Sequence, residues 1–382
     1  MRSRFRFHSR YLLVLCAVTL SLLGLVFIYS ASGYEAELTY GDAFFYVKKQ
    51  AISFAAGIVC LIAARFLKPK ILRKGRVVIL LFSLVSLGLV FIPGLGVESY
   101  GATRWINLGF TTVQPSEIAK FGLMIYLASY LDAHPPTRIR TLIPPLLIGA
   151  STCLLIMAEP NMSVTVCVGA CVFLTLFVSG GKKRWFLPVF LLVAAAIPVL
   201  ILLEPYRVKR IVAFLDPWQN PLGEGYQLIQ SYYAIGNGGL FGVGLFRSRQ
   251  KYLFLPFSES DFIFSVIAEE TGLFGCFVVL MIFALYVLCG IRVSMRAKSR
   301  FDALLSFSLT SVVAVQTLLN VAVVTGSVPP TGLPLPFVSA GGTSLVAFLF
   351  STGLLYGVAK RNDETFVPEL STRTIRRRAP AT

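Results

Sequence analysis

The side chains of this chain that could do chemistry gather in four stretches: 99–120, 159–161, 204–261 and 326–344. These stretches are rich in Gly, Pro, Trp and charged residues, whereas the segments between them are almost entirely apolar. The two histidines, His8 and His134, lie outside all four. Proton transfer in these stretches would therefore need a carboxylate as the base.

Asp261 is the leading candidate for that base. It follows a loop with six basic residues and directly precedes an apolar run, with Glu269 and Glu270 two turns further on. A carboxylate beside cations, at the edge of an apolar environment, is suited to proton abstraction. The alternative is that Asp261 only caps the helix that follows, because Asp accepts hydrogen bonds from free backbone N–H groups there.

Basic residues offer a site for an anionic group. Arg207, Lys209 and Arg210 open the loop 204–261. Arg matches phosphate oxygens with paired hydrogen bonds, and Lys adds a point charge. Loops of this length are usually functional. We therefore expect these three side chains to stabilise a phosphate or pyrophosphate.

Two other stretches add polar groups near apolar segments. In 99–120, Glu117 and Lys120 are three residues apart and would share one helix face, so they could pair at the membrane boundary. Arg104 and Trp105 precede them, and the alternative interpretation is an interfacial Trp anchor before a capped helix. In 159–161, Pro160 and Asn161 are typical of a turn.

The stretch 326–344 contains four prolines and four glycines, which a regular helix does not tolerate. Irregular backbone at membrane depth is found where it lines protein or a cavity. Gln316 and Asn320 lie one turn apart on the preceding segment and could hydrogen-bond this loop. We predict a cavity wall that includes the following side chains: Gln316, Asn320, Pro334, Pro336 and Ser339.

The composition places these stretches in a membrane protein. The chain has 382 residues, of which 56% are hydrophobic and 14% charged, against about 25% charged in soluble domains. The net charge of +17 does not indicate a nucleic-acid binder, because the basic residues form short clusters between apolar runs. Ten apolar segments have roughly the length of a membrane span: 11–31, 50–67, 77–94, 117–131, 142–158, 162–179, 185–203, 262–290, 303–326 and 341–358.

The basic residues also predict the orientation. With a cytoplasmic N-terminus, the cytoplasmic segments hold 24 of the 35 Lys and Arg residues, as the positive-inside rule requires. These segments are 1–10, 68–76, 132–141, 180–184, 291–302 and 359–382. We therefore expect an all-α integral membrane protein with both termini cytoplasmic, in which 1–382 form one polytopic domain. The loop 204–261 is then extracytoplasmic and 359–382 form a basic cytoplasmic tail.

The ordered polar motifs resemble the SEDS family (shape, elongation, division and sporulation) of cell-wall polymerases. The resemblance covers almost the whole chain and is nearest to the division and sporulation branch, with the elongation branch as the near alternative. Its motifs are Tyr29-Ser30-Ala31-Ser32, Arg104-Trp105-Ile106, Gln114-Pro115-Ser116-Glu117 with Lys120, Phe214-Leu215-Asp216-Pro217-Trp218, Gly225-Tyr226-Gln227 with Gln230-Ser231, Ala234–Gly239, Asp261-Phe262-Ile263-Phe264 with Glu269-Glu270, and Gly332-Leu333-Pro334-Leu335-Pro336-Phe337.

The resemblance implies a ten-span peptidoglycan glycosyltransferase that polymerises lipid II during cell division. Asp261 matches the essential aspartate of the family, and Gln227 and Gln230 become further binding candidates. The implied partners are a class B penicillin-binding protein, which supplies the transpeptidase, and other division proteins, in a bacterial cytoplasmic membrane at the septum. A divalent cation, Mg or Mn, could assist the leaving pyrophosphate, although no metal-ligand motif is visible.

The chain departs from the family pattern at a few positions. Phe257 and Glu259 stand where the family usually has Glu and His, Asn161 replaces a usual Asp, and Ala340 replaces a common Tyr. Two alternative functions stay open, a lipid II flippase and a non-enzymatic scaffold for the transpeptidase.

Overall fold

The computed structural model describes residues 9–99, 102–109, 111–188 and 205–364, together with the single positions 191, 195, 198 and 202. The described elements, in chain order, are α1 Ser9–Tyr40, α2 Phe45–Ala64, α3 Pro69–Lys74, α4 Arg76–Leu89, β1 Gly96–Ser99, β2 Ala102–Asn107, β3 Thr112–Val113, α5 Pro115–Ala133, η1 Ile139–Leu142, α6 Ile143–Ala158, α7 Met162–Val178, η2 Lys183–Trp185, α9 Pro205–Leu215, η3 Pro217–Gln219, α10 Tyr226–Gly238, α11 Ile263–Met295, α12 Arg300–Val324 and α13 Gly342–Glu364.

The predicted class of helical membrane protein is confirmed. Within the described ranges, six helical segments are long and apolar enough to cross a membrane, and two shorter apolar helices, α4 and α7, accompany them. Most of the predicted segment 185–203 and the tail beyond Glu364 lie outside the described residues. The count of ten spans and the orientation therefore stay predictions.

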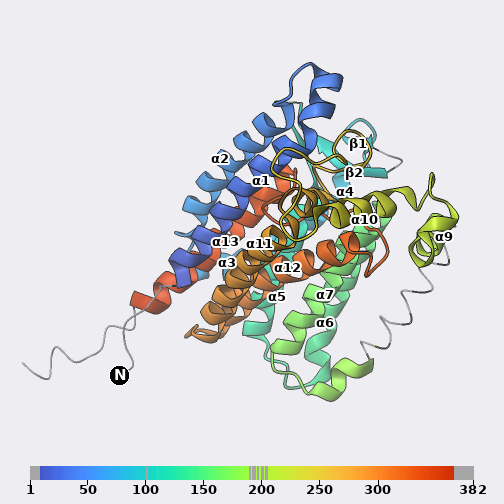
Figure 1. The fold of residues 1–382 in the computed structure, drawn as a ribbon. Coiled ribbons are helices and arrows are strands. Elements are labelled where there is room, and N and C mark those ends of the chain that lie inside the picture. The colour runs from blue at the N-terminus through green and yellow to red at the C-terminus, as the bar shows by residue number, and fades with distance from the viewer. Residues whose placement is uncertain are drawn as a thin grey trace, which may run out of the picture.

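Helix α5 is the centre of the bundle. Its sequence is apolar on almost every side, and it packs against α4, α7, α12 and α13 (Figure 1). Phe121, Leu123, Met124 and Leu127 are all buried. A helix that is hydrophobic all round is stable only inside a bundle, so α5 provides the frame from which the polar residues at its ends are positioned.

A small antiparallel sheet covers one end of the bundle (Figure 1). Strand β2 pairs with β1 and with β3, and Gly96 and Val113 both lie opposite Ile106. The sequence analysis did not anticipate these strands. They place Arg104 and Trp105 on a rigid element instead of a loop.

The segments predicted to be cytoplasmic meet at the other end of the bundle. Arg73 pairs with Asp132 at 3.4 Å, and Arg361 pairs with Asp302 at 3.0 Å. Arg300 donates to backbone carbonyls at the ends of α5 and α7. The chain thus has one end that carries the sheet and the long loop, and one end held together by arginines.

Glycines permit the closest helix packing in the bundle. At Gly353 of α13, an added Cβ would lie 2.3 Å from the carbonyl oxygen of Leu61 in α2. Small residues let helix backbones approach in this way.

We expect Gly353→Ala to destabilise the protein by about 1–3 kcal/mol, because the methyl group forces α2 and α13 apart. Gly88→Ala in α4 is the matched control, since a methyl group there meets no atom within 4 Å and Ala favours a helix. Thermal unfolding in detergent would measure both. Equal melting temperatures for the two variants would contradict the prediction.

Candidate active site

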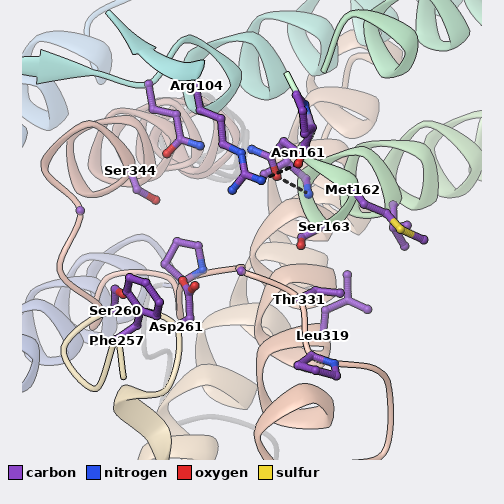
Figure 2. A pocket seen from close by; sticks show the side chains of 18 of the residues that line it. Arg104, Asn161, Met162, Ser163, Phe257, Ser260, Asp261, Leu319, Thr331 and Ser344 are labelled. Atoms are coloured by element: carbon purple, nitrogen blue, oxygen red, sulfur yellow. Dashed lines mark hydrogen bonds between the residues drawn. The ribbon is translucent and has the colours of Figure 1, made fainter. Parts of the chain in front are cut away.

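A cavity of about 880 Å³ lies beneath the sheet, at the end of the bundle that carries the long loop. The polar part of its wall comes from segments far apart in sequence: Arg104, Trp105 and Gln114, Asn161 and Ser163, Arg210 and Gln227, Ser260 and Asp261, and Thr331, Thr343 and Ser344. Arg104 faces Asp261 across this space (Figure 2). The sequence-predicted base therefore lies at an internal cavity and not on the outer surface.

The carboxylate of Asp261 is available for chemistry. Helix α11 begins at Ile263 with Phe262 as its N-cap residue, and no side chain caps it. The alternative role of Asp261 as a helix cap is thus wrong. Among the described residues, neither oxygen of this carboxylate has a hydrogen-bond partner, while its backbone carbonyl accepts from Asn320 Nδ2 at 2.9 Å.

The loop 326–341 holds the backbone of the two residues that precede Asp261. Ser339 Oγ donates to the carbonyl of Ser260 at 2.6 Å, and the Ala340 N–H donates to the carbonyl of Glu259 at 2.9 Å. Asn320 Nδ2 also donates to the Leu333 carbonyl at 2.7 Å. The proline- and glycine-rich stretch is therefore a clamp for the segment that carries the base.

Gly332 brings this loop directly against the carboxylate. A Cβ added at Gly332 would lie 2.9 Å from Asp261 Oδ2. Any larger residue would occupy space beside that oxygen, and so the absence of a side chain keeps the carboxylate accessible from the cavity.

Two arginines set the charge around Asp261. Burial raises the pKa of its carboxyl to about 6, and the positive charges of Arg104 and Arg210 partly counter this rise. Arg104 is held by the backbone carbonyls of Glu159 and Pro160, and Arg210 donates to the Pro330 carbonyl at 3.1 Å. These backbone carbonyls help to position both guanidinium groups at the cavity that Asp261 also lines.

Glu159 is an unusual neighbour of this site. Its side chain is fully buried, and neither carboxyl oxygen has a hydrogen-bond partner in the described part of the chain. Burial raises its pKa to about 8, against the opposing effect of Arg104. Glu159 is therefore uncharged near neutral pH, which leaves the charge of Arg104 directed to the cavity.

The positions that depart from the family pattern lie around Asp261 without displacing it. Phe257 lines the cavity with a φ of 56°, a left-handed conformation uncommon for a bulky residue. Glu259 does not line the cavity; burial, together with the nearby Glu35 and Asp261, raises its pKa to about 7. Asn161 caps α7 by accepting from the Val164 N–H, so the replaced Asp is not needed for this turn.

Glu117 and Lys120 pair as predicted but do not reach the cavity. Lys120 Nζ lies 2.7 Å from Glu117 Oε2 and 2.6 Å from Gln316 Oε1, with both charged side chains about 1% exposed. Gln316 Nε2 in turn donates to the Pro334 carbonyl at 2.8 Å. This buried triad ties α5 and α12 to the loop 326–341, and neither Glu117 nor Lys120 is part of the cavity lining.

The loop before Asp261 is anchored by a second polar network that the sequence analysis did not assign. Glu269 and Glu270 accept hydrogen bonds from the backbone N–H groups of 248–250. Lys251 Nζ lies 3.5 Å from Glu270 and 3.2 Å from Ser30 Oγ. The Glu-Glu pair and the early Tyr-Ser-Ala-Ser motif thus position the loop.

The structure brings together only part of the predicted set. Arg104, Trp105, Arg210, Gln227, Asp261 and Pro334 line the cavity. Four predicted cavity-wall residues lie outside the lining: Gln316, Asn320, Pro336 and Ser339. Gln316, Asn320 and Ser339 instead form hydrogen bonds that hold the loop 326–341 in place. Lys209 is exposed and Gln230 lies away from the lining, while the side chain of Arg207 lies outside the described residues. Gln114, Thr331, Thr343 and Ser344 also line the cavity. They lie in a motif and a stretch that the sequence singles out, but were not chosen as site residues.

The residues of this site do not fit a resident metal. The described residues contain no group of three His, Cys, Asp or Glu side chains that could hold one. The fixed charges acting on Asp261 are those of two arginines, which disfavour a cation. We therefore derive no chemical step from a metal.

We expect Glu159→Gln to stabilise the protein increasingly as pH rises from 5 to 8. The folded pKa is raised above the unfolded value of 4.5, so ionisation favours the unfolded state in this window, by about 3 kcal/mol at pH 7. Melting temperatures across this pH range would show a widening gap between variant and parent. The exposed Glu98→Gln is the control, and a constant gap for Glu159→Gln would refute the assignment.

Comparison with known proteins identifies the family. A family model described as a cell cycle protein and named for FtsW, RodA and SpoVE matches residues 10–364. Stage V sporulation protein E of Bacillus subtilis (strain 168) is 36% identical, over 91% of this chain and 96% of that protein. A probable peptidoglycan glycosyltransferase FtsW of Geobacter metallireducens is 38% identical, over 92% and 96%.

Solved structures of similar proteins support the same family assignment. A chain from the study "Structural coordination of polymerization and crosslinking by a peptidoglycan synthase complex" matches with a TM-score of 0.77 and 29% identity, over 92% of this chain and 97% of that one. The rod shape determining protein RodA of Thermus thermophilus matches with a TM-score of 0.68 and 25% identity, over 92% and 96%. The chain therefore belongs to the FtsW, RodA and SpoVE family and is a multi-pass membrane protein.

Proposed function

We propose that this protein is a peptidoglycan glycosyltransferase that polymerises lipid II, with Asp261 as its general base. The observation that carries the proposal is a carboxylate without hydrogen-bond partners among the described residues, which faces a cavity that also holds Arg104 and Arg210. The naming of relatives as probable peptidoglycan glycosyltransferases supports the reaction class.

The geometry suits inversion at a sugar carbon. Asp261 takes the proton from the acceptor hydroxyl, and the resulting oxygen attacks the anomeric carbon on the face opposite the pyrophosphate-lipid. The C–O bond to pyrophosphate breaks, and the guanidinium groups of Arg104 and Arg210 stabilise the departing negative charge. A pKa of about 6 leaves Asp261 mostly ionised at neutral pH and still basic enough to accept a proton.

The cavity is also suited to a lipid-linked substrate. Its wall continues from the arginines to the apolar side chains of Met157, Met162, Val166 and Leu319. Val166 is exposed on the outer face of α7, so the apolar end reaches the surface that lipid would cover. A pyrophosphate can lie beside the arginines while its lipid tail leaves along this apolar wall.

The partner and the place of action follow as proposals from the relatives. One similar chain comes from a structure described as a peptidoglycan synthase complex that coordinates polymerization and crosslinking. A class B penicillin-binding protein as transpeptidase partner, with other division proteins at the septum of the cytoplasmic membrane, is the corresponding proposal here. Sporulation and elongation are the alternative settings.

One reconstitution separates the polymerase from the two alternative functions. The purified protein, with and without its transpeptidase partner, would receive labelled lipid II in vesicles. Glycan ladders support the polymerase, transfer between leaflets without ladders supports the flippase, and neither product supports the scaffold.

We expect Asp261→Asn to reduce the polymerisation rate by about 10²–10⁴-fold, because the amide cannot accept the proton. The parent rate should rise with pH through about 6, as the carboxylate ionises, and the residual rate of the variant should not. Gel analysis of labelled glycan would measure both. Glu224→Gln, at an exposed acid away from the cavity, is the control, and a parental rate for Asp261→Asn would exclude the proposed role.

We expect Gly332→Ala to slow polymerisation by about tenfold or more with little change in melting temperature. Its methyl group would lie 2.9 Å from Asp261 Oδ2, where the acceptor hydroxyl must approach, and a misplacement of about 1 Å can cost 10²-fold. Gly236→Ala is the control, because its methyl group meets no atom within 4 Å. Equal rates for both variants would show that this oxygen is not the one used.

A further inference from the structure

A second cavity lies at the end of α6 that is remote from Asp261. Its volume is about 210 Å³, and its wall is almost wholly apolar, formed chiefly by Ile139, Ile143, Leu146, Phe173, Leu176 and Trp185. On α6, Leu146 lines this cavity and Met157 lines the first one, so about 16 Å of helix separates the two. It is therefore a separate site and not an extension of the active site.

The mouth of this cavity is also apolar. Ile139 and Ile143, which line it, are 51% and 47% exposed, respectively. The cavity lies between the start of α6, the last turns of α7 and the short helix η2, and α6 and α7 run side by side (Figure 1). An apolar cavity with an apolar mouth between two membrane helices is suited to a hydrocarbon chain.

The two segments that form its rim are positively charged and lack acidic partners. Arg138, Arg140, Lys182 and Arg184 are all exposed, and none pairs with an acid among the described residues. Lys182 Nζ lies 5.9 Å from the ring centre of Trp185, which lines the cavity.

The nearest acid before these cations, Asp132, pairs with Arg73 at 3.4 Å. The sequence contains no Asp or Glu between 133 and 158, or between 160 and 203. The charge at this rim is therefore complementary to an anion supplied from outside the chain.

We propose that this cavity binds an anionic phospholipid, with one acyl chain between α6 and α7 and the phosphate held by Arg140, Lys182 and Arg184. Basic pockets between membrane helices bind anionic headgroups on the cytoplasmic side, and these residues lie in the two segments predicted to be cytoplasmic. The apolar cavity selects a lipid over free phosphate. The site does not depend on the reaction at Asp261.

The charge requirement is tested on the full purified chain with phosphatidylglycerol and phosphatidylcholine. Native mass spectrometry would count the lipid molecules retained after delipidation. We expect the parent to retain phosphatidylglycerol selectively. Removing three cations as Arg140→Gln, Lys182→Gln and Arg184→Gln should weaken retention at least about tenfold, since each surface cation contributes roughly fivefold.

The matched control removes three exposed cations of the same end that do not flank the cavity, as Lys70→Gln, Lys74→Gln and Arg296→Gln. It should retain phosphatidylglycerol as the parent does. Equal loss in both triple variants, or equal retention of both lipids by the parent, would show general surface attraction and overturn the site.

The acyl-chain requirement is tested by filling the cavity. Ile143→Trp should abolish selective retention, whereas Leu147→Trp, at an exposed neighbour outside the cavity wall, should not. Unchanged retention in Ile143→Trp would overturn the proposal, as would displacement of the lipid by inorganic phosphate. None of these results depends on polymerase activity, so failure here is distinguishable from failure of the proposed function.

Discussion

The hydrogen bonds that fasten the backbone of 259–261 to the loop 326–341 are the constraint on which the cavity depends. Asn320, Ser339 and Ala340 all donate to backbone carbonyls of this segment and to none of its side chains. Asp261 is thereby held in place while its carboxylate stays available. Hydrogen bonds to the Asp261 side chain would have fixed the same position, but they would have occupied the carboxylate oxygens that the proposed reaction needs.

The ionisable side chains inside the bundle lie in three different environments, which give them different charge states. Glu117 and Lys120 neutralise one another, and Lys120 also donates to Gln316, so the pair links helices of the bundle. Glu159 has no such partner among the described residues and remains protonated near neutral pH. Asp261 opens to a cavity with two arginines, which lets it ionise. The cost of burying a charge thus distinguishes Asp261, which lines the cavity, from Glu117 and Glu159, which do not.

The long loop before Asp261 is anchored by contacts that do not involve the side chains of Phe257 and Glu259. Glu269 and Glu270 accept hydrogen bonds from the backbone of 248–250. Hydrogen bonds from Ser339 and its neighbours hold the backbone of 259–261. Phe257 and Glu259 supply neither contact with their side chains. Their divergence from the family pattern therefore affects the cavity lining and the local charge and leaves these anchoring contacts in place.

Local patterns in the sequence determined the helical membrane class, the pairing of Glu117 with Lys120 and the irregular loop 326–344, and they singled out Asp261 as the candidate base. Hydropathy, charge and i,i+3 spacing are properties of neighbouring residues, so they can be read without a fold. Only the tertiary structure decided that Arg104 and Arg210 act on Asp261, that Gly332 lies against its carboxylate, and that Glu117 and Lys120 do not line the cavity. Residues about 50 to 160 positions from Asp261 meet there through helix packing and a small sheet, and no local pattern encodes that convergence.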